Sequence, residues 1–135
     1  MINAAQKARL ESNKEAFLIG VTILTSLDET QLKLIGFKDK VPQLVKKLAS
    51  EAKKALLDGV VCSAQEAKEL KKTFGKDFIL VTPGIRTNSH KGDQSRVTTL
   101  KEAINYGSDY LVLGREISNA KDIPQMIKDI ESYII

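Results

Sequence analysis

Short apolar runs alternate along this chain with longer amphipathic stretches, and this alternation limits the possible folds more than any other feature. The runs are residues 17–24, 59–62, 78–81 and 110–113. They are apolar at successive positions, as expected for strands buried on both faces of a parallel sheet. Strand–helix units joined by short connections imply right-handed βαβ crossovers. We therefore predict an α/β fold with about four parallel strands.

The expected helices begin and end at recognisable residues. A serine or threonine followed three residues later by glutamate forms a capping box at a helix start. Such pairs are Ser26 with Glu29, Ser63 with Glu66, and Thr99 with Glu102. Gly75 is placed to end the helix that begins after Ser63. Asp122 and Pro124 are placed to begin the last helix. Residues 1–15 are expected to form a leading helix.

Two helices are expected to bury one apolar face each, because their apolar residues recur at three- and four-residue steps. The first face consists of Val41, Leu44, Val45, Leu48, Ala49 and Ala52. The second consists of Met126, Ile127, Ile130 and Ile134.

Composition excludes several classes of function. The net charge is only +4, aromatic residues make up 5%, and the lysines are spread along helical stretches, so no nucleic-acid partner is expected. The longest apolar run is far shorter than the roughly 20 residues that span a membrane, and no signal pattern is present at the N-terminus. We expect a cytoplasmic protein without a membrane partner.

The chain has a single cysteine, Cys62. It cannot form an intrachain disulfide and is expected to be a buried thiol.

Candidate binding residues follow the apolar runs, because parallel α/β folds bind ligands beyond the carboxyl ends of their strands. These segments are Thr25–Ser26, Ser63, residues 82–86 and Gly114–Arg115. Two of them place an arginine close to a glycine. Glycine lets a backbone amide approach an anion, and arginine offers a planar fork of donors to phosphate. The spacing suggests a phosphorylated small-molecule ligand.

The polar stretch from Thr87 to Arg96 is longer than the roughly 2–6 residues usual in a βα loop. Long polar loops at this end of a barrel often close over a substrate, and a mobile surface loop is the alternative. The composition of the stretch favours neither interpretation.

Five segments closely resemble bacterial orotidine 5'-phosphate decarboxylases in order and spacing. They are residues 21–26 (VTILTS), 58–67 (DGVVCSAQEA), 81–86 (VTPGIR), 92–96 (GDQSR) and 110–115 (YLVLGR). The resemblance implies the C-terminal half of a (β/α)8 barrel of the ribulose-phosphate-binding type. Residues 1–135 would form a single partial-barrel domain, with a leading helix followed by strands five to eight of the family barrel and their helices.

The same resemblance implies the substrate-binding residues. They are Thr25 and Ser26 at the pyrimidine ring edge, Arg86 and Gln94 as further ligand contacts, and Gly114 and Arg115 at the phosphate. Each has a structural alternative: a helix cap for Thr25 or Ser26, an ion pair for Arg86, and turn chemistry for the Gly–Arg pair. His90 matches no required position and is expected to be solvated.

The chain departs from the family pattern at two local positions, neither of which contacts ligand, and in one larger feature that bears on function. Leu100 and Glu116 stand where the family commonly has proline, which puts local helix starts in doubt. The charged Asp-Lys-Asp-Lys-type array of the second and third barrel strands has no counterpart, and Lys38–Asp39 is better placed between two helices. We therefore expect no catalytic residue in this sequence, which looks like a fragment of the family barrel.

The resemblance implies a lyase of pyrimidine (UMP) biosynthesis that converts orotidine 5'-phosphate to UMP without a cofactor or metal. It implies a homodimer for the complete enzyme and a chain that is inactive alone. Two alternatives remain open: a related sugar-phosphate decarboxylase or aldolase of the same barrel type, and a non-catalytic phosphate-binding half-barrel.

Overall fold

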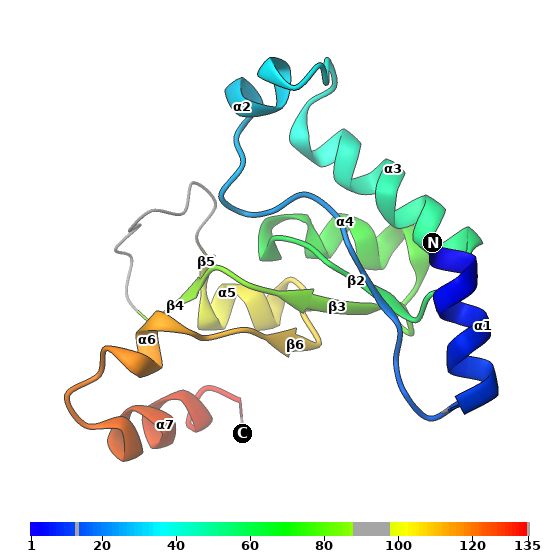
Figure 1. Ribbon diagram of the computed structural model, residues 1–135. Helices are drawn as coiled ribbons and strands as arrows, with labels where there is room; N and C mark the ends of the chain where they lie inside the picture. The colour runs from blue at the N-terminus through cyan, green and yellow to red at the C-terminus, as the bar shows by residue number, and fades with distance from the viewer. Residues whose placement is uncertain (13, 88–97, 135) are drawn as a thin grey trace.

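The computed structural model describes residues 1–12, 14–87 and 98–134 (Figure 1). The helices are α1 (Ile2–Ser12), α2 (Glu29–Leu34), α3 (Val41–Lys54), α4 (Ala64–Phe74), α5 (Leu100–Asn105), α6 (Arg115–Ser118) and α7 (Ile123–Glu131). The strands are β1 (Ile19–Val21), β2 (Gly59–Val61), β3 (Ile79–Thr82), β4 (Ile85–Arg86), β5 (Thr98–Thr99) and β6 (Tyr110–Leu111).

The central sheet has the strand order β1-β2-β3-β6, and all of its pairs are parallel. Val21, Val61 and Val81 lie side by side in the register, and Tyr110 follows Val81. The four predicted runs thus form the four strands of a parallel sheet, although each strand is shorter than or equal to its run. The short pair β4–β5 was not predicted, because its two-residue strands flank a long polar stretch.

The core forms between the sheet and the helices that follow its strands (Figure 1). Val60, Cys62 and Leu80 are almost fully buried there, so the predicted buried thiol is confirmed. On the sheet's other face, Val21 is 62%, Tyr110 52% and Val112 47% exposed. The expectation of strands buried on both faces is therefore wrong for the described chain. Apolar runs alone do not tell which face the chain's own helices cover.

Most predicted helix boundaries are confirmed. Ser63 with Glu66 and Thr99 with Glu102 form capping boxes, so Leu100 does not displace its helix start. Gly75 follows α4 with a φ of +93°, a conformation that suits glycine, and the Asp122 side chain accepts from Gln125 N. The predicted apolar faces were too wide. Leu48 is 41% exposed on α3, and Ile127 and Ile134 near the C-terminus are 41% and 60% exposed.

The predicted capping box of Ser26 and Glu29 is wrong. Helix α2 begins two residues later: Asp28 accepts from Gln31 N at 2.8 Å, and Gln31 Oε1 accepts from Asp28 N at 2.9 Å. The local sequence contains both patterns, and an aspartate is as good an N-cap as a serine. The structure uses the second pattern, which leaves Ser26 exposed at the end of the β1 segment.

Two aspartates repeat one arrangement at the amino ends of the strands. Asp58 Oδ2 accepts from Leu18 N at 2.7 Å and forms an ion pair with Arg9 Nη1 at 3.1 Å. Asp109 Oδ2 accepts from Leu80 N at 2.7 Å and forms an ion pair with Lys71 Nζ at 2.6 Å. In each case the aspartate's own N–H donates to the carbonyl of the same neighbouring residue. Each aspartate therefore extends the hydrogen-bond ladder between parallel strands and forms an ion pair with a side chain from a helix, Arg9 or Lys71.

Within the described residues, none of the helices is both long and apolar enough to cross a bilayer.

Candidate functional site

The carboxyl ends of β1, β2, β3 and β6 lie next to one another because backbone hydrogen bonds continue beyond the strands. Thr22 N donates to Val61 O at 3.2 Å, Cys62 N donates to Val81 O at 3.1 Å, and Val112 N donates to Thr82 O at 3.0 Å. The segments that follow the strands therefore begin from one edge of the sheet. Residues far apart in sequence can meet there.

A cavity of about 220 Å³ opens at this edge. Its lining residues come from three strand ends and the start of α6: Val21, Ile23, Leu24, Thr25, Ser26, Val61, Cys62, Pro83 and Arg115. Thr25 is buried and Ser26 is exposed, and the lining combines their hydroxyls and Arg115 with mostly apolar side chains. Of the six predicted binding residues, Thr25, Ser26 and Arg115 line this cavity.

Gly114 lies beside Arg115 as the N-cap of the short helix α6. A Cβ atom built on Gly114 would meet no described atom within 4 Å. Packing against the described residues therefore does not require glycine here. The space next to the Gly114 backbone is open at the point where Arg115 begins the helix.

Arg86 is predicted to bind ligand but does not line the cavity. Its residue is only 8% exposed at the end of β4. Its Nε lies 3.5 Å from Glu116 Oε1, and its Nη1 lies 3.5 Å from Ile85 O. The ion-pair alternative for Arg86 thus has a structural counterpart, although the pair is buried rather than on the surface. An ion pair orients a guanidinium and does not by itself exclude a ligand contact.

Glu116 was not identified from the sequence as a functional residue. Its Oε2 accepts from Thr87 N at 3.2 Å and from Thr87 Oγ1 at 2.6 Å. It therefore links α6 to the end of β4, across 29 positions of sequence. The only sequence signal was the departure from Gly-Arg-Pro to Gly-Arg-Glu at residues 114–116, which we related to the helix start rather than to the site.

Gln94 and His90 lie outside the described residues, as does most of the polar stretch to which they belong. The predicted contact of Gln94, the expected solvation of His90 and the two interpretations of the stretch therefore remain predictions.

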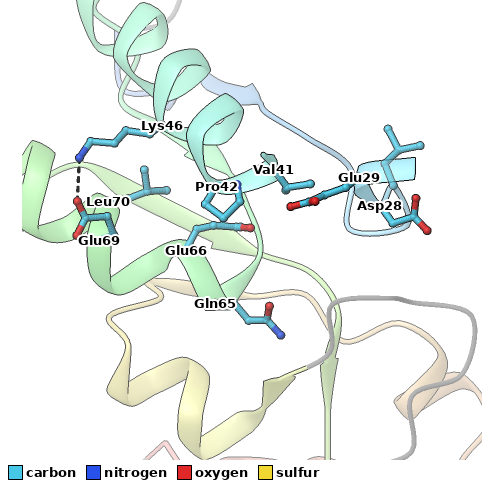
Figure 2. Close-up of a pocket in the computed structure, with 10 residues that line it drawn as sticks. Asp28, Glu29, Val41, Pro42, Lys46, Gln65, Glu66, Glu69 and Leu70 are labelled. Atoms are coloured by element: carbon cyan, nitrogen blue, oxygen red, sulfur yellow. Dashed lines mark hydrogen bonds and ion pairs between the residues drawn. The ribbon is translucent and has the colours of Figure 1, made fainter. Parts of the chain in front are cut away.

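A second cavity, of about 370 Å³, lies between α2, α3 and α4 (Figure 2). Three of its four acidic side chains have intramolecular partners. Asp28 caps α2, Glu66 Oε2 accepts from Ser63 N at 2.7 Å, and Glu69 is 2.8 Å from Lys46 Nζ. These carboxylates serve helix caps and an ion pair, so we do not choose this cavity as the functional site.

Two carboxylates with lowered pKa values lie away from the strand-end cavity. The hydrogen bond from Lys46 lowers the pKa of Glu69, and the hydroxyl of Thr99 lowers the pKa of Glu102. Neither residue lines that cavity. Among the described residues, no cluster of three or more His, Cys, Asp or Glu side chains could hold a metal ion.

The parallel sheet, the helices that follow its strands and the cavity at their carboxyl ends define a chain of the (β/α)-barrel class. The model of the "Orotidine 5'-phosphate decarboxylase / HUMPS family" matches residues 1–130, and the chain belongs to this family.

Curated relatives include the orotidine 5'-phosphate decarboxylase of Coxiella burnetii (strain RSA 493 / Nine Mile phase I). It is 51% identical over 135 residues, which cover 99% of this chain and 56% of the relative. The enzyme of Pseudoalteromonas translucida is 49% identical over 99% of this chain and 58% of its own length. The chain thus spans about half the length of the curated relatives it matches.

Solved structures agree with the fold. Orotidine 5'-phosphate decarboxylase from Lactobacillus acidophilus matches with a TM-score of 0.81 and 32% identity, over 98% of this chain and 57% of that one. The enzyme from Methanocaldococcus jannaschii, complexed with the inhibitor BMP, matches with a TM-score of 0.70 over 98% of this chain and 55% of that one. At 18% identity, the second match bears on the fold alone.

Proposed function

We propose that this chain supplies the phosphate- and pyrimidine-binding side of an orotidine 5'-phosphate decarboxylase, which converts orotidine 5'-phosphate to UMP. The observation that carries the proposal is that Thr25, Ser26 and Arg115 line one cavity at the strand ends. A nucleotide has a ring edge that hydroxyls can contact and a phosphate that an arginine can bind, so one cavity with both kinds of group suits it.

Gly114 supports the phosphate side of the proposal. The space that a Cβ atom would occupy is free of described atoms, so a ligand's phosphate can approach the Gly114 backbone beside Arg115. Barrels commonly place a phosphate site after their last strands. Contacts to a phosphate far from the reacting carbon can contribute to catalysis when they strengthen in the transition state.

Two alternatives share the phosphate site. A related sugar-phosphate decarboxylase or aldolase would use Arg115 but would leave Thr25 and Ser26 without a ring to contact. A non-catalytic phosphate-binding half-barrel would bind ligand without any chemistry. The hydroxyls that share the cavity with Arg115 favour the nucleotide over the first alternative.

We propose further that the chain alone is inactive, since it has no counterpart of the family's charged Lys/Asp array, and that the complete enzyme is a cytoplasmic homodimer. Purified chain, free of host enzyme, should show no more turnover of orotidine 5'-phosphate than a substrate-free blank, and turnover above that level would contradict this claim.

Complementation tests the enzymatic role itself. Co-expression with the N-terminal part of the 51%-identical Coxiella burnetii relative should give a co-purifying complex with restored decarboxylation. A complex that forms, binds UMP and stays inactive would favour the non-catalytic half-barrel. If the two parts never co-purify, complementation is wrong and the family membership still stands.

A further inference from the structure

We propose that Glu116 is a positioning residue that holds Arg86 in place for the nucleotide's phosphate. The inference rests on the proposed function and extends it to a residue outside the cavity. It begins from the three contacts that this one carboxylate makes. Oε1 lies 3.5 Å from Arg86 Nε, and Oε2 accepts both the N–H and the hydroxyl of Thr87.

These contacts join the two arginine-bearing segments of the site. Glu116 directly follows Arg115 at the start of α6, whereas Arg86 and Thr87 end the β4 segment. A displacement of α6 would therefore carry Arg115 and, through Glu116, the guanidinium of Arg86. Because the Arg86 side chain is 10% and the Glu116 side chain 20% exposed, water screens this pair less than a surface pair.

The geometry of the pair leaves Arg86 able to act on an anion. The carboxylate contacts the guanidinium at Nε, and the terminal nitrogens carry further N–H groups on the same rigid plane. A guanidinium fixed at Nε loses less rotational freedom on binding a phosphate than a freely rotating one. Glu116 would thus contribute by orientation, without touching the ligand.

The chain contains a matched control for this carboxylate. Glu102 Oε2 accepts from Thr99 N at 3.0 Å and from Thr99 Oγ1 at 2.7 Å, which closely repeats the contacts of Glu116 with Thr87. Thr99 also lies opposite Arg86 in the β4–β5 register. In both Glu116→Gln and Glu102→Gln, the amide oxygen can still accept from the threonine. Only Glu116→Gln removes a negative charge from Arg86.

The experiment uses the 135-residue chain labelled with ¹⁵N, with UMP and uridine as probes. Glu116→Gln should weaken UMP binding by up to about tenfold, since the guanidinium of Arg86 remains but is no longer held at Nε for the phosphate. Uridine binding should not change. Glu116→Gln should also move the Arg86 Nε–H resonance toward that of a solvated arginine. Glu102→Gln should alter neither the UMP affinity nor this resonance.

A double-mutant cycle decides whether Glu116 acts through Arg86. In the Arg86→Ala background, Glu116→Gln should cause no further loss of UMP affinity. If Glu116→Gln binds UMP like the wild type, or if its effect persists without Arg86, the positioning role is overturned and the proposed function survives. If the wild type binds UMP no better than uridine, the proposed phosphate site has failed and the inference falls with it.

Discussion

The two ends of the central sheet use their charged side chains differently. At the amino ends, Asp58 and Asp109 each bind a backbone N–H of the neighbouring strand and a cation from a helix. At the carboxyl ends, hydroxyls and Arg115 surround a cavity of about 220 Å³. In barrels of this type, the amino face serves stability and the carboxyl face carries the active site.

This difference between the two ends of the sheet indicates which charged side chains stabilise the fold and which are available to bind a ligand. An aspartate that completes a strand ladder already has a purpose within the fold, and its loss should be felt in folding. An arginine that lines an open cavity can meet a ligand, and its loss should be felt in binding. Substitutions at the two ends should therefore separate stability from ligand affinity.

The largest effect is expected at the amino ends. Asp109→Ala removes the acceptor of Leu80 N and the carboxylate beside Lys71, whose side chain is only 15% exposed. We expect the free energy of unfolding to fall by about 2–4 kcal/mol, because the buried Leu80 N–H loses its acceptor and the mostly buried Lys71 keeps only the carbonyls of Lys76 and Phe78 as partners. Urea denaturation followed by circular dichroism measures the change.

Asp109→Asn is the control for this prediction, because its amide oxygen can still accept from Leu80 N while the charge is lost. Its loss should be smaller, about 1 kcal/mol. The assignment of this end to stability would be wrong if Asp109→Ala left the unfolding midpoint unchanged or weakened UMP binding in the folded chain.

The second effect is expected at the carboxyl ends. In the complex completed by an N-terminal part, Arg115→Ala should weaken nucleotide binding and slow turnover by about 1.5–3 kcal/mol, as for hydrogen bonds to charged groups. Binding and turnover of substrate without its phosphate should hardly change, since the group that the arginine binds is missing. Steady-state kinetics with nucleotide and nucleoside provide the contrast. Equal harm to both would make Arg115 structural.

The smallest effects separate two neighbouring residues between β1 and α2. Asp28 caps α2, whereas Ser26 is exposed and lines the cavity. Asp28→Ala should destabilise the chain by about 1 kcal/mol, as for loss of an N-cap, and Ser26→Ala by less than about 0.5 kcal/mol. Thermal denaturation compares the two variants, and a larger loss for Ser26→Ala would restore a structural role for the serine.

Local features of the fold could be predicted from sequence, because a local pattern determines them. The boxes at Ser63 and Thr99 use partners three residues apart, and the apolar runs mark their strands directly. The box at Ser26 failed because an equally good pattern begins at Asp28. Both Ser26 and Asp28 match an N-cap pattern, and the local sequence does not tell which of them begins the helix.

Long-range contacts could not be predicted in the same way. Thr25, Ser26 and Arg115, three of the residues that line the cavity, were found by their position after strands and by resemblance. Glu116 was not, because its partners Arg86 and Thr87 are 30 and 29 positions away and no periodic pattern joins them. A charged residue in place of a family proline was the single available signal, and its meaning depends on the folded geometry.

Contacts at the amino ends of the strands attach helix α1 to the rest of the chain. This attachment bears on the order in which parts of the chain unfold. None of its residues is buried, and hydrogen bonds tie it to the rest of the described chain, from Arg9 to Asp58 and Ala16 O and from Gln6 to Leu56 O. An element held by such contacts can open locally at a fraction of the global cost. Its ion pair is partly buried, with the Arg9 side chain 16% and the Asp58 side chain 25% exposed, so salt should weaken the attachment of α1 less than it would weaken a surface pair.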